Sequence, residues 1–388
     1  MKILHLTSLD QGGAAKAVKR INSALKEHAQ SEIFFFKDKN KIFRNMISKP
    51  YSVLNKIISD KENKVINTTY SSNSVFFSYI PLMIRIKNPD IVHLHWINGG
   101  MINVKDLLKI NKPIVWTMHD YWPFSGGYHY PIDREYSNFK KNDEIIEIKK
   151  KVYEKINKIK FIAVSENLMN EAKKSYLLSN KDVNYINNPL NSNFFKIMDK
   201  SECRGKYGIN DDLTVLFCSN NSINKKNKNF VFLKNVLNEF SKNKAINLII
   251  CGEKKIIKDK IKLNKNIKLY ETGFTNSERE LSMIYNCADI TAVPSNKEAF
   301  GQVASESCAC GTPVIALRNT GLSDIIIHKE NGYLCMDENV SDFINGINWI
   351  NNQSKNILSE KCKKSVSKFS YDLIAKKYIK LYNEILKS

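Results

Sequence analysis

Two successive blocks of short apolar runs, each alternating with helical patterns, constrain the fold of this 388-residue chain most strongly. In the first block, runs of strand character lie at 2–8, 31–36, 90–95, 113–118, 161–165 and 183–186. In the second block they lie at 214–218, 247–251, 267–271, 290–294 and 313–317. Short β-branched runs separated by helices are typical of buried parallel strands. The pattern therefore predicts an α/β fold of two doubly wound, Rossmann-like domains.

A turn-rich segment, NNPLN at 187–191, separates the two blocks. We predict an N-terminal domain at 1–188, a C-terminal domain at 189–370, and a final helix at 371–388 that packs back on the N-terminal domain. Further helices are expected at 12–26, 143–159, 229–240 and 277–287, and irregular loops at 37–70 and 122–142. Because ligands bind beyond the carboxyl ends of such strands, we expect a site in a cleft where the two domains face each other.

The formal net charge of +21 has three possible origins. Lysine can simply fill solvated faces, or the surface can be attracted to anionic lipid, or the chain can bind nucleic acid. Lysine dominates over arginine and no basic–aromatic RNA-binding signature is present, so nucleic acid is the least favoured partner. The basic helical stretch 147–160 would be the membrane-facing element, although an ordinary solvated helix packed on its sheet is the favoured interpretation.

Cysteine usage and hydropathy bear on the location of the chain. Its eight cysteines form no CxxC pair or Cys/His cluster, which predicts reduced thiols and no metal framework. No segment approaches the roughly 18–20 apolar residues of a membrane span. The start, MKILHL, is interpreted as a first strand and not as a signal peptide. We expect a cytoplasmic protein, with contact at the inner face of the cytoplasmic membrane as a further hypothesis.

Residues 291–315, TAVPSNKEAFGQVASESCACGTPVI, carry the clearest chemical signal. Glu298 and Glu306 flank a turn, Ala299-Phe300-Gly301, which joins an apolar strand to a helix. A glycine turn at a helix N-terminus binds anions, because backbone N–H groups and the helix dipole face the ligand. Carboxylates on both sides of such a phosphate site suit sugar hydroxyls, so this segment predicts binding of a nucleotide-sugar.

This C-terminal motif resembles the EX7E signature of retaining GT-B glycosyltransferases of family 4. Other similar segments follow in the family's order along nearly the whole chain, namely MKILH with Gly12-Gly13, DIVHLH at 90–95, PIVWTMHD at 113–120, AVSE at 163–166 and YNCAD at 285–289. The segment 116–130, which contains YWPFSGG, is especially similar to members that build bacterial surface polysaccharides. The resemblance implies transfer of a sugar, with retained anomeric configuration, from a nucleotide-diphosphate sugar to a hydroxyl of a glycan or lipid-linked acceptor.

The same resemblance implies roles for individual residues. Glu298 would bind hydroxyls of the donor sugar and Glu306 those of the ribose. Lys226 and Lys228, together with the helix start Phe300-Gly301-Gln302, would stabilise the leaving diphosphate. His119 would contact the donor sugar or polarise the transition state. The remaining donor-binding candidates are Gly12, Gly13, Ser219 and Asn220.

Two departures from the family pattern stand out. Asn229 occupies the place where a glycine is usual, which leaves open whether Lys225, Lys226 or Lys228 reaches the diphosphate. The irregular insert lacks the cysteines that some relatives carry, and no DxD-like acidic pair lies in a fitting position. We therefore expect neither a metal nor a cofactor beyond the nucleotide-sugar donor.

Bland alternatives remain for several of these residues. Gly12-Gly13 can be a tight turn without a ligand, and His119 can be a buried histidine or a partner of Asp120. His93 and His95 alternate along a predicted strand, and we expect both to be packed in the core. Alternative functions are another GT-B enzyme, such as a sugar-nucleotide epimerase or a phosphorylase, a catalytically silent relative, or, less favoured, a basic nucleic-acid-binding protein.

Overall fold

The computed structural model describes residues 1–37, 50, 53–54, 57, 70–71, 73, 78–130, 140–219, 223, 226–253, 261–318 and 320–388. These residues form two compact units. Unit 1 comprises Met1–Pro189 and Tyr371–Ser388, and unit 2 comprises Leu190–Ser370. Each unit has its own six-stranded sheet, and every pairing within both sheets is parallel.

The sheet of unit 1 has the strand order β2-β1-β3-β4-β5-β6. Its strands are β1 (Lys2–Leu9), β2 (Gln30–Lys37), β3 (Ile91–Leu94), β4 (Ile114–Met118), β5 (Ile159–Ala163) and β6 (Val183–Tyr185). Helices α1 (Gly13–Leu25), α3 (Ile80–Lys87), α4 (Lys140–Lys155) and α5 (Glu166–Lys174) accompany it, with short 3-10 turns η1 (Val104–Lys109) and η2 (Trp122–Phe124). Every residue of β3 and β4 is buried, as expected for strands covered on both faces.

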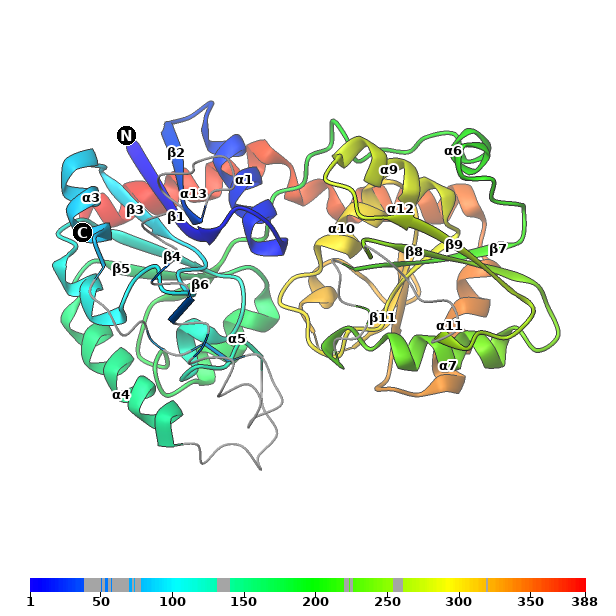
Figure 1. The fold of residues 1–388 in the computed structure, drawn as a ribbon. Coiled ribbons are helices and arrows are strands. Elements are labelled where there is room, and N and C mark those ends of the chain that lie inside the picture. Colours follow the sequence, from blue (N-terminus) through cyan, green and yellow to red (C-terminus); the bar gives the residue numbers. More distant parts are fainter. Residues whose placement is uncertain are drawn as a thin grey trace. The chain divides into compact units, whose positions relative to one another are not determined.

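The last helix, α13 (Tyr371–Lys387), is part of unit 1 although it follows the whole of unit 2 in sequence. It lies beside α1, as Figure 1 shows for the red and blue helices. Its apolar residues share one core with residues of α1, β1, β3, β4 and β5. The core contribution of α13 includes two fully buried tyrosines, Tyr378 and Tyr382.

Unit 2 repeats the architecture with the strand order β12-β11-β10-β7-β8-β9. Its strands are β7 (Leu213–Cys218), β8 (Ile246–Cys251), β9 (Ile267–Gly273), β10 (Ile290–Val293), β11 (Val314–Leu317) and β12 (Gly332–Cys335). Its helices are α6 (Lys200–Tyr207), α7 (Phe230–Phe240), α9 (Glu278–Cys287), α10 (Gln302–Ala309), α11 (Val340–Asn351) and α12 (Lys355–Val366), with 3-10 turns η4 (Lys226–Lys228), η5 (Gly321–Asp324) and η6 (Ser367–Phe369). Helices α7 and α11 lie together on one side of the sheet, and α9, α10 and α12 on the other (Figure 1).

The predicted α/β fold of two Rossmann-like domains is confirmed, and each predicted strand is present to within a few residues. The helix predicted at 143–159 is displaced, since α4 already begins at Lys140 and Ile159 starts β5. The strand predicted at 161–165 ends two residues earlier, because Ser165 caps α5 by accepting a hydrogen bond from the Leu168 amide. The strand β12 was not predicted from the sequence, because its four residues, GYLC, include none of the β-branched side chains that mark the other strands.

Two features concern the expected location and redox state. Over the ranges that the structure describes, no helix is both long and apolar enough to cross a membrane. All eight cysteines are free thiols, of which only Cys218 is partly exposed. Most of the loop predicted at 37–70 lies outside the described residues. The loop predicted at 122–142 is described except at 131–139, and it contains η2 at its start and the first turn of α4 at its end.

Candidate active site

The strand–turn–helix segment predicted to bind the donor lies in unit 2, between β10 and α10. Gly301 is the residue before the helix, with φ 102° and ψ 59°, and no side chain caps the helix. A Cβ atom at this position would lie 2.2 Å from Cδ2 of Leu322. The angle and the close approach both require glycine here, so the turn cannot tolerate a side chain without rearrangement.

The same turn is held by the segment that follows β11. The amide of Gly321 donates to the carbonyl of Glu298 at 2.8 Å. A Cβ atom on Gly321 would lie 2.2 Å from the carbonyl oxygen of Ala299. Phe300 is 3% exposed, and its ring meets that of Phe369 edge-on. Thus the Phe300 side chain anchors the turn, while Gln302, partly exposed, begins α10.

Glu298 forms an ion pair that distinguishes the candidate lysines. Its Oε2 lies 2.8 Å from Nζ of Lys228, and the two side chains are 19% and 27% exposed. Lys226, two residues earlier in η4, is exposed. The structure therefore brings Lys228 to the carboxylate, whereas Lys225 and Asn220 lie outside the described residues.

Asn229 adopts the left-handed backbone conformation, with φ 52° and ψ 40°, directly before α7. Glycine reaches this region without strain, and asparagine is among the residues that tolerate it best. The asparagine at the place of the usual glycine therefore preserves the backbone path.

Glu306 is 3% exposed on α10. Its Oε2 accepts a hydrogen bond from the Tyr285 hydroxyl of α9 at 2.9 Å. Burial raises the pKa of Tyr285 well above its usual value, and the neighbouring Cys218 and Glu306 act in the same direction. Tyr285 therefore remains a hydrogen-bond donor, and it holds one oxygen of the Glu306 carboxylate in a defined position.

The loop after β7 is organised by Glu253, a residue that was not predicted from the sequence. The buried Glu253 Oε1 accepts hydrogen bonds from the Ser219 hydroxyl at 2.6 Å and from the Ile223 amide at 2.9 Å. The available signal was its place two residues after β8, at the carboxyl end of a strand. Ser219, a predicted donor-binding residue, thus uses its hydroxyl proton within the protein.

His119 follows β4 in unit 1, where burial lowers its pKa to about 4 although the adjacent Asp120 acts in the opposite direction. The neighbouring Asp120 forms its own contacts with Nδ1 of His129 at 2.7 Å and with the indole N–H of Trp96 at 3.1 Å. Asp120 therefore has other partners, and the hydrogen bond of His119 goes instead to His95, at 3.0 Å.

The predicted glycine loop of unit 1 is open. Gly12 has φ 96° and immediately precedes α1, and a Cβ atom on Gly12 or Gly13 would meet no atom of the described residues within 4 Å beyond its chain neighbours. The positive φ explains glycine at the first position. The free space around the two glycines is compatible with both interpretations of the loop, which are a plain turn and a substrate-facing loop.

Comparison with known proteins places both units in one family. The family profile described as "Glycosyltransferase Family 4" matches residues 11–194, and that described as "Glycosyl transferases group 1" matches residues 199–369. The chain belongs to the GT-B glycosyltransferases of the family 4 type. The family assignment made from the ordered sequence motifs is thereby confirmed.

Individual relatives of this chain are distant. Over 177 residues it is 27% identical to N-acetyl-alpha-D-glucosaminyl L-malate synthase of Bacillus anthracis, which is 45% of each chain. It spans less than half of the length of the curated relatives it matches. Sucrose-phosphate synthase from Thermosynechococcus elongatus has a similar fold over the full length of both chains, with a TM-score of 0.74 and 16% identity. HepE of Anabaena, solved in complex with UDP-glucose, aligns over 99% of this chain and 100% of its own, with a TM-score of 0.67 and 16% identity.

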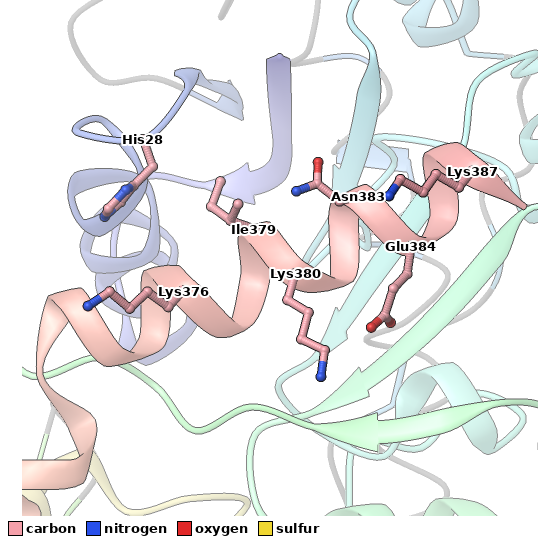
Figure 2. Close-up of a pocket in the computed structure, with 7 residues that line it drawn as sticks. All are labelled: His28, Lys376, Ile379, Lys380, Asn383, Glu384 and Lys387. Carbon is pink, nitrogen blue, oxygen red and sulfur yellow. The ribbon is translucent and has the colours of Figure 1, made fainter.

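A surface pocket of about 440 Å³ lies elsewhere on unit 1 (Figure 2). Six of its seven lining residues come from α13, and the seventh is His28. Three of the six are lysines, Lys376, Lys380 and Lys387. None of the predicted site residues lines this pocket, so it is a basic surface feature separate from the candidate site.

Proposed function

We propose that this protein is a retaining glycosyltransferase of bacterial surface polysaccharide assembly. It transfers a sugar from a nucleotide-diphosphate sugar to a hydroxyl of a glycan or lipid-linked acceptor. The observation that carries the proposal is the combination at α10: the Glu298–Lys228 pair, the glycine turn and the buried Glu306. The reported complex of HepE with UDP-glucose supports the class of donor.

In this proposal the charged residues at and near α10 bind different parts of the donor. The carboxylate of Glu298 binds sugar hydroxyls, and that of Glu306 binds the ribose hydroxyls. Lys228 is neutralised by Glu298 before substrate binds, and a diphosphate would compete for the same ammonium group. Lys228 and the N–H groups at the start of α10 then stabilise the negative charge of the leaving group, each charge-assisted bond contributing about 1.5–3 kcal/mol.

The proton of the acceptor hydroxyl would pass to the β-phosphate oxygen of the leaving nucleotide, so the mechanism requires no protein base. His119 contributes a contact to the donor sugar. We further propose that transfer needs no metal, since Lys228 and the helix N–H groups supply the positive charge. Activity that survives EDTA treatment would support this point, and loss that Mg²⁺ restores would contradict it.

Variants at α10 and η4 test the proposed function. We expect Glu298→Gln, Glu306→Gln and Lys228→Ala to lower transfer by about 10- to 100-fold, as expected for loss of hydrogen bonds to charged groups. Lys226→Ala is the matched control, because that lysine is exposed and comes from the same turn. The measurement is release of nucleoside diphosphate from a panel of nucleotide-sugars, with the product's anomeric configuration read by NMR.

The outcomes of this screen separate the alternatives. Full activity of the Glu298 and Glu306 variants would show that these residues do not form the donor site. Conversion of the donor without any acceptor would indicate an epimerase, and salt-sensitive binding of duplex or single-stranded nucleic acid without sugar transfer would favour the nucleic-acid alternative.

We also propose that helix α4 contacts an anionic membrane surface. Lys149 of α4 cannot make this contact, because this lysine is buried and donates to the carbonyls of Ser125 at 3.0 Å and Gly126 at 2.6 Å. We propose that the exposed lysines Lys151 and Lys155 of the same helix attract anionic lipid. Co-sedimentation with vesicles should then increase with the fraction of anionic lipid, and the double variant to glutamine should reduce it. Equal binding to neutral and anionic vesicles would contradict a role of these lysines in membrane contact.

A further inference from the structure

A line of hydrogen-bonded imidazoles crosses the sheet of unit 1 at the neighbouring strands β1, β3 and β4. Nε2 of His119 lies 3.0 Å from Nδ1 of His95. Nε2 of His95 lies 2.9 Å from Nδ1 of His5. Nε2 of His5 in turn lies 3.0 Å from the hydroxyl oxygen of Ser31 on β2. Three rings are therefore linked end to end, always through Nε2 of one and Nδ1 of the next.

The far end of this line sets the direction of every bond in it. The Ser31 hydroxyl donates its only proton to Oδ1 of Asn22, at 2.8 Å. Ser31 must then accept from Nε2–H of His5. A neutral imidazole carries one N–H group, so Nδ1 of His5 accepts from His95, and Nδ1 of His95 accepts from His119. We call the four residues behind His119 the imidazole relay: Asn22, Ser31, His5 and His95.

The direction persists only while each ring is neutral, because an imidazolium donates from both nitrogens. Burial lowers the pKa of His5 to about 3 and that of His119 to about 4, and it lowers the pKa of His95 well below its usual value. The other titratable groups around these rings are His93, which lowers the pKa of His95 further, and Asp120, which raises that of His119. At neutral pH the rings are therefore uncharged.

A metal ion is the competing explanation for clustered histidines. Ring nitrogens of His5, His93 and His95 lie within 4.8 Å of one another. The two nitrogens of His93, however, are hydrogen-bonded to the Thr117 hydroxyl and to the Tyr382 hydroxyl, both at 2.7 Å. Nε2 of His95 and Nδ1 of His5 are hydrogen-bonded to each other. The nitrogens are thus used in hydrogen bonds within the protein.

We propose that the imidazole relay holds His119 in its Nε2–H tautomer, so that Nδ1 accepts a hydrogen bond from a hydroxyl of the donor sugar. His119 is partly exposed, and among the described residues its Nδ1 makes no hydrogen bond. An Nδ1 without a proton selects a hydroxyl, which can donate, over a phosphate or carbonyl oxygen, which cannot. The role in recognition rests on the proposed function, whereas the tautomer does not.

The tautomer can be read directly by NMR on the full chain labelled with ¹⁵N-histidine, without substrate. Long-range ¹H–¹⁵N correlation at pH 7.5, assigned with single His→Gln variants, should give the Nε2–H pattern for His5, His95 and His119. In Ser31→Ala we expect the Nδ1–H form of His119 to appear, and in Ser31→Thr, which keeps the hydroxyl, the wild-type pattern. An Nδ1–H tautomer of His119 in the wild type, or ring signals that change on addition of Zn²⁺ or EDTA, would overturn the relay.

The same variants test what the relay does for the sugar. With the nucleotide-sugar found active in the donor screen, Ser31→Ala should lower kcat/KM by about tenfold, as for one lost hydrogen bond, and Ser31→Thr should restore it. The affinity for the free nucleoside diphosphate should be unchanged, since it has no donor sugar. Unaltered kcat/KM in a Ser31→Ala protein with an altered tautomer would overturn the role in recognition. An absence of transfer in the wild type would count against the proposed function, while the spectra would still decide the tautomer.

Discussion

At the scale of single residues, the backbone angle of Asn229 accounts for its departure from the family pattern. Its φ of 52° belongs to a region that glycine enters freely and most other residues enter at a cost. Its side-chain nitrogen is buried and, within the described ranges, has no hydrogen-bond partner. The residue therefore contributes a conformation more than a contact, and this argues against an interpretation of the chain as a catalytically silent relative.

Substitutions at Asn229 should follow this ranking of backbone cost. We expect Asn229→Gly to change the free energy of unfolding by less than about 0.5 kcal/mol, and Asn229→Ala to reduce it by about 1 kcal/mol. Urea denaturation followed by circular dichroism measures both. Equal losses in the two variants would mean that the amide group, and not the angle, is what position 229 requires.

At the scale of elements, the β10–α10 connection is a turn fixed from both sides. Gly301 supplies a positive φ at its end, and the amide of Gly321 binds the carbonyl of Glu298 near its start. The position of Glu298 is consequently set by backbone hydrogen bonding across 23 residues of sequence, and not by the local sequence alone. Such a connection keeps a carboxylate and a helix N-terminus at a constant separation.

Two glycine-to-alanine substitutions in unit 2 should have opposite effects. Gly301→Ala combines an unfavourable φ with a contact at 2.2 Å to Leu322, so we expect a loss of about 1–3 kcal/mol in unfolding free energy and weaker donor binding. A Cβ atom at Gly205, inside α6, would meet no described atom outside its own helix within 4 Å, so Gly205→Ala should stabilise by up to about 1 kcal/mol. Thermal unfolding of both variants measures this. A tolerated Gly301→Ala would show that the turn can relax.

At the scale of the whole molecule, the histidines with lowered pKa values are concentrated in unit 1, and His328 is the one in unit 2. Unit 1 contains four buried or partly buried histidines, His5, His93, His95 and His119, whose pKa values lie below the usual 6.5. Between the lowered value and 6.5, the unfolded chain binds protons that the folded chain does not. The unfolding free energy of unit 1 therefore rises with pH in this window and falls as the solution is acidified.

We expect His5 and His119 each to reduce the unfolding free energy by about 1 kcal/mol between pH 7 and pH 5.5, with His93 and His95 acting in the same direction. Urea denaturation at the two pH values measures the difference, and hydrogen exchange should locate the loss in unit 1. His119→Gln should remove about 1 kcal/mol of the difference, whereas the exposed His28→Gln should not. A pH response that is the same in both variants would contradict the assignment.

The two parallel sheets and the turn between Glu298 and Glu306 could be predicted from the sequence alone. Parallel strands covered on both faces must be short apolar runs, and a glycine turn before a helix is a local pattern, so both are visible along the chain. Three findings required the folded chain: Lys228 and not Lys226 forms the ion pair with Glu298, Lys149 is buried, and His5, His95 and His119 form one line. These outcomes depend on partners 23 to 90 residues apart, and no periodicity records which polar group a distant strand presents.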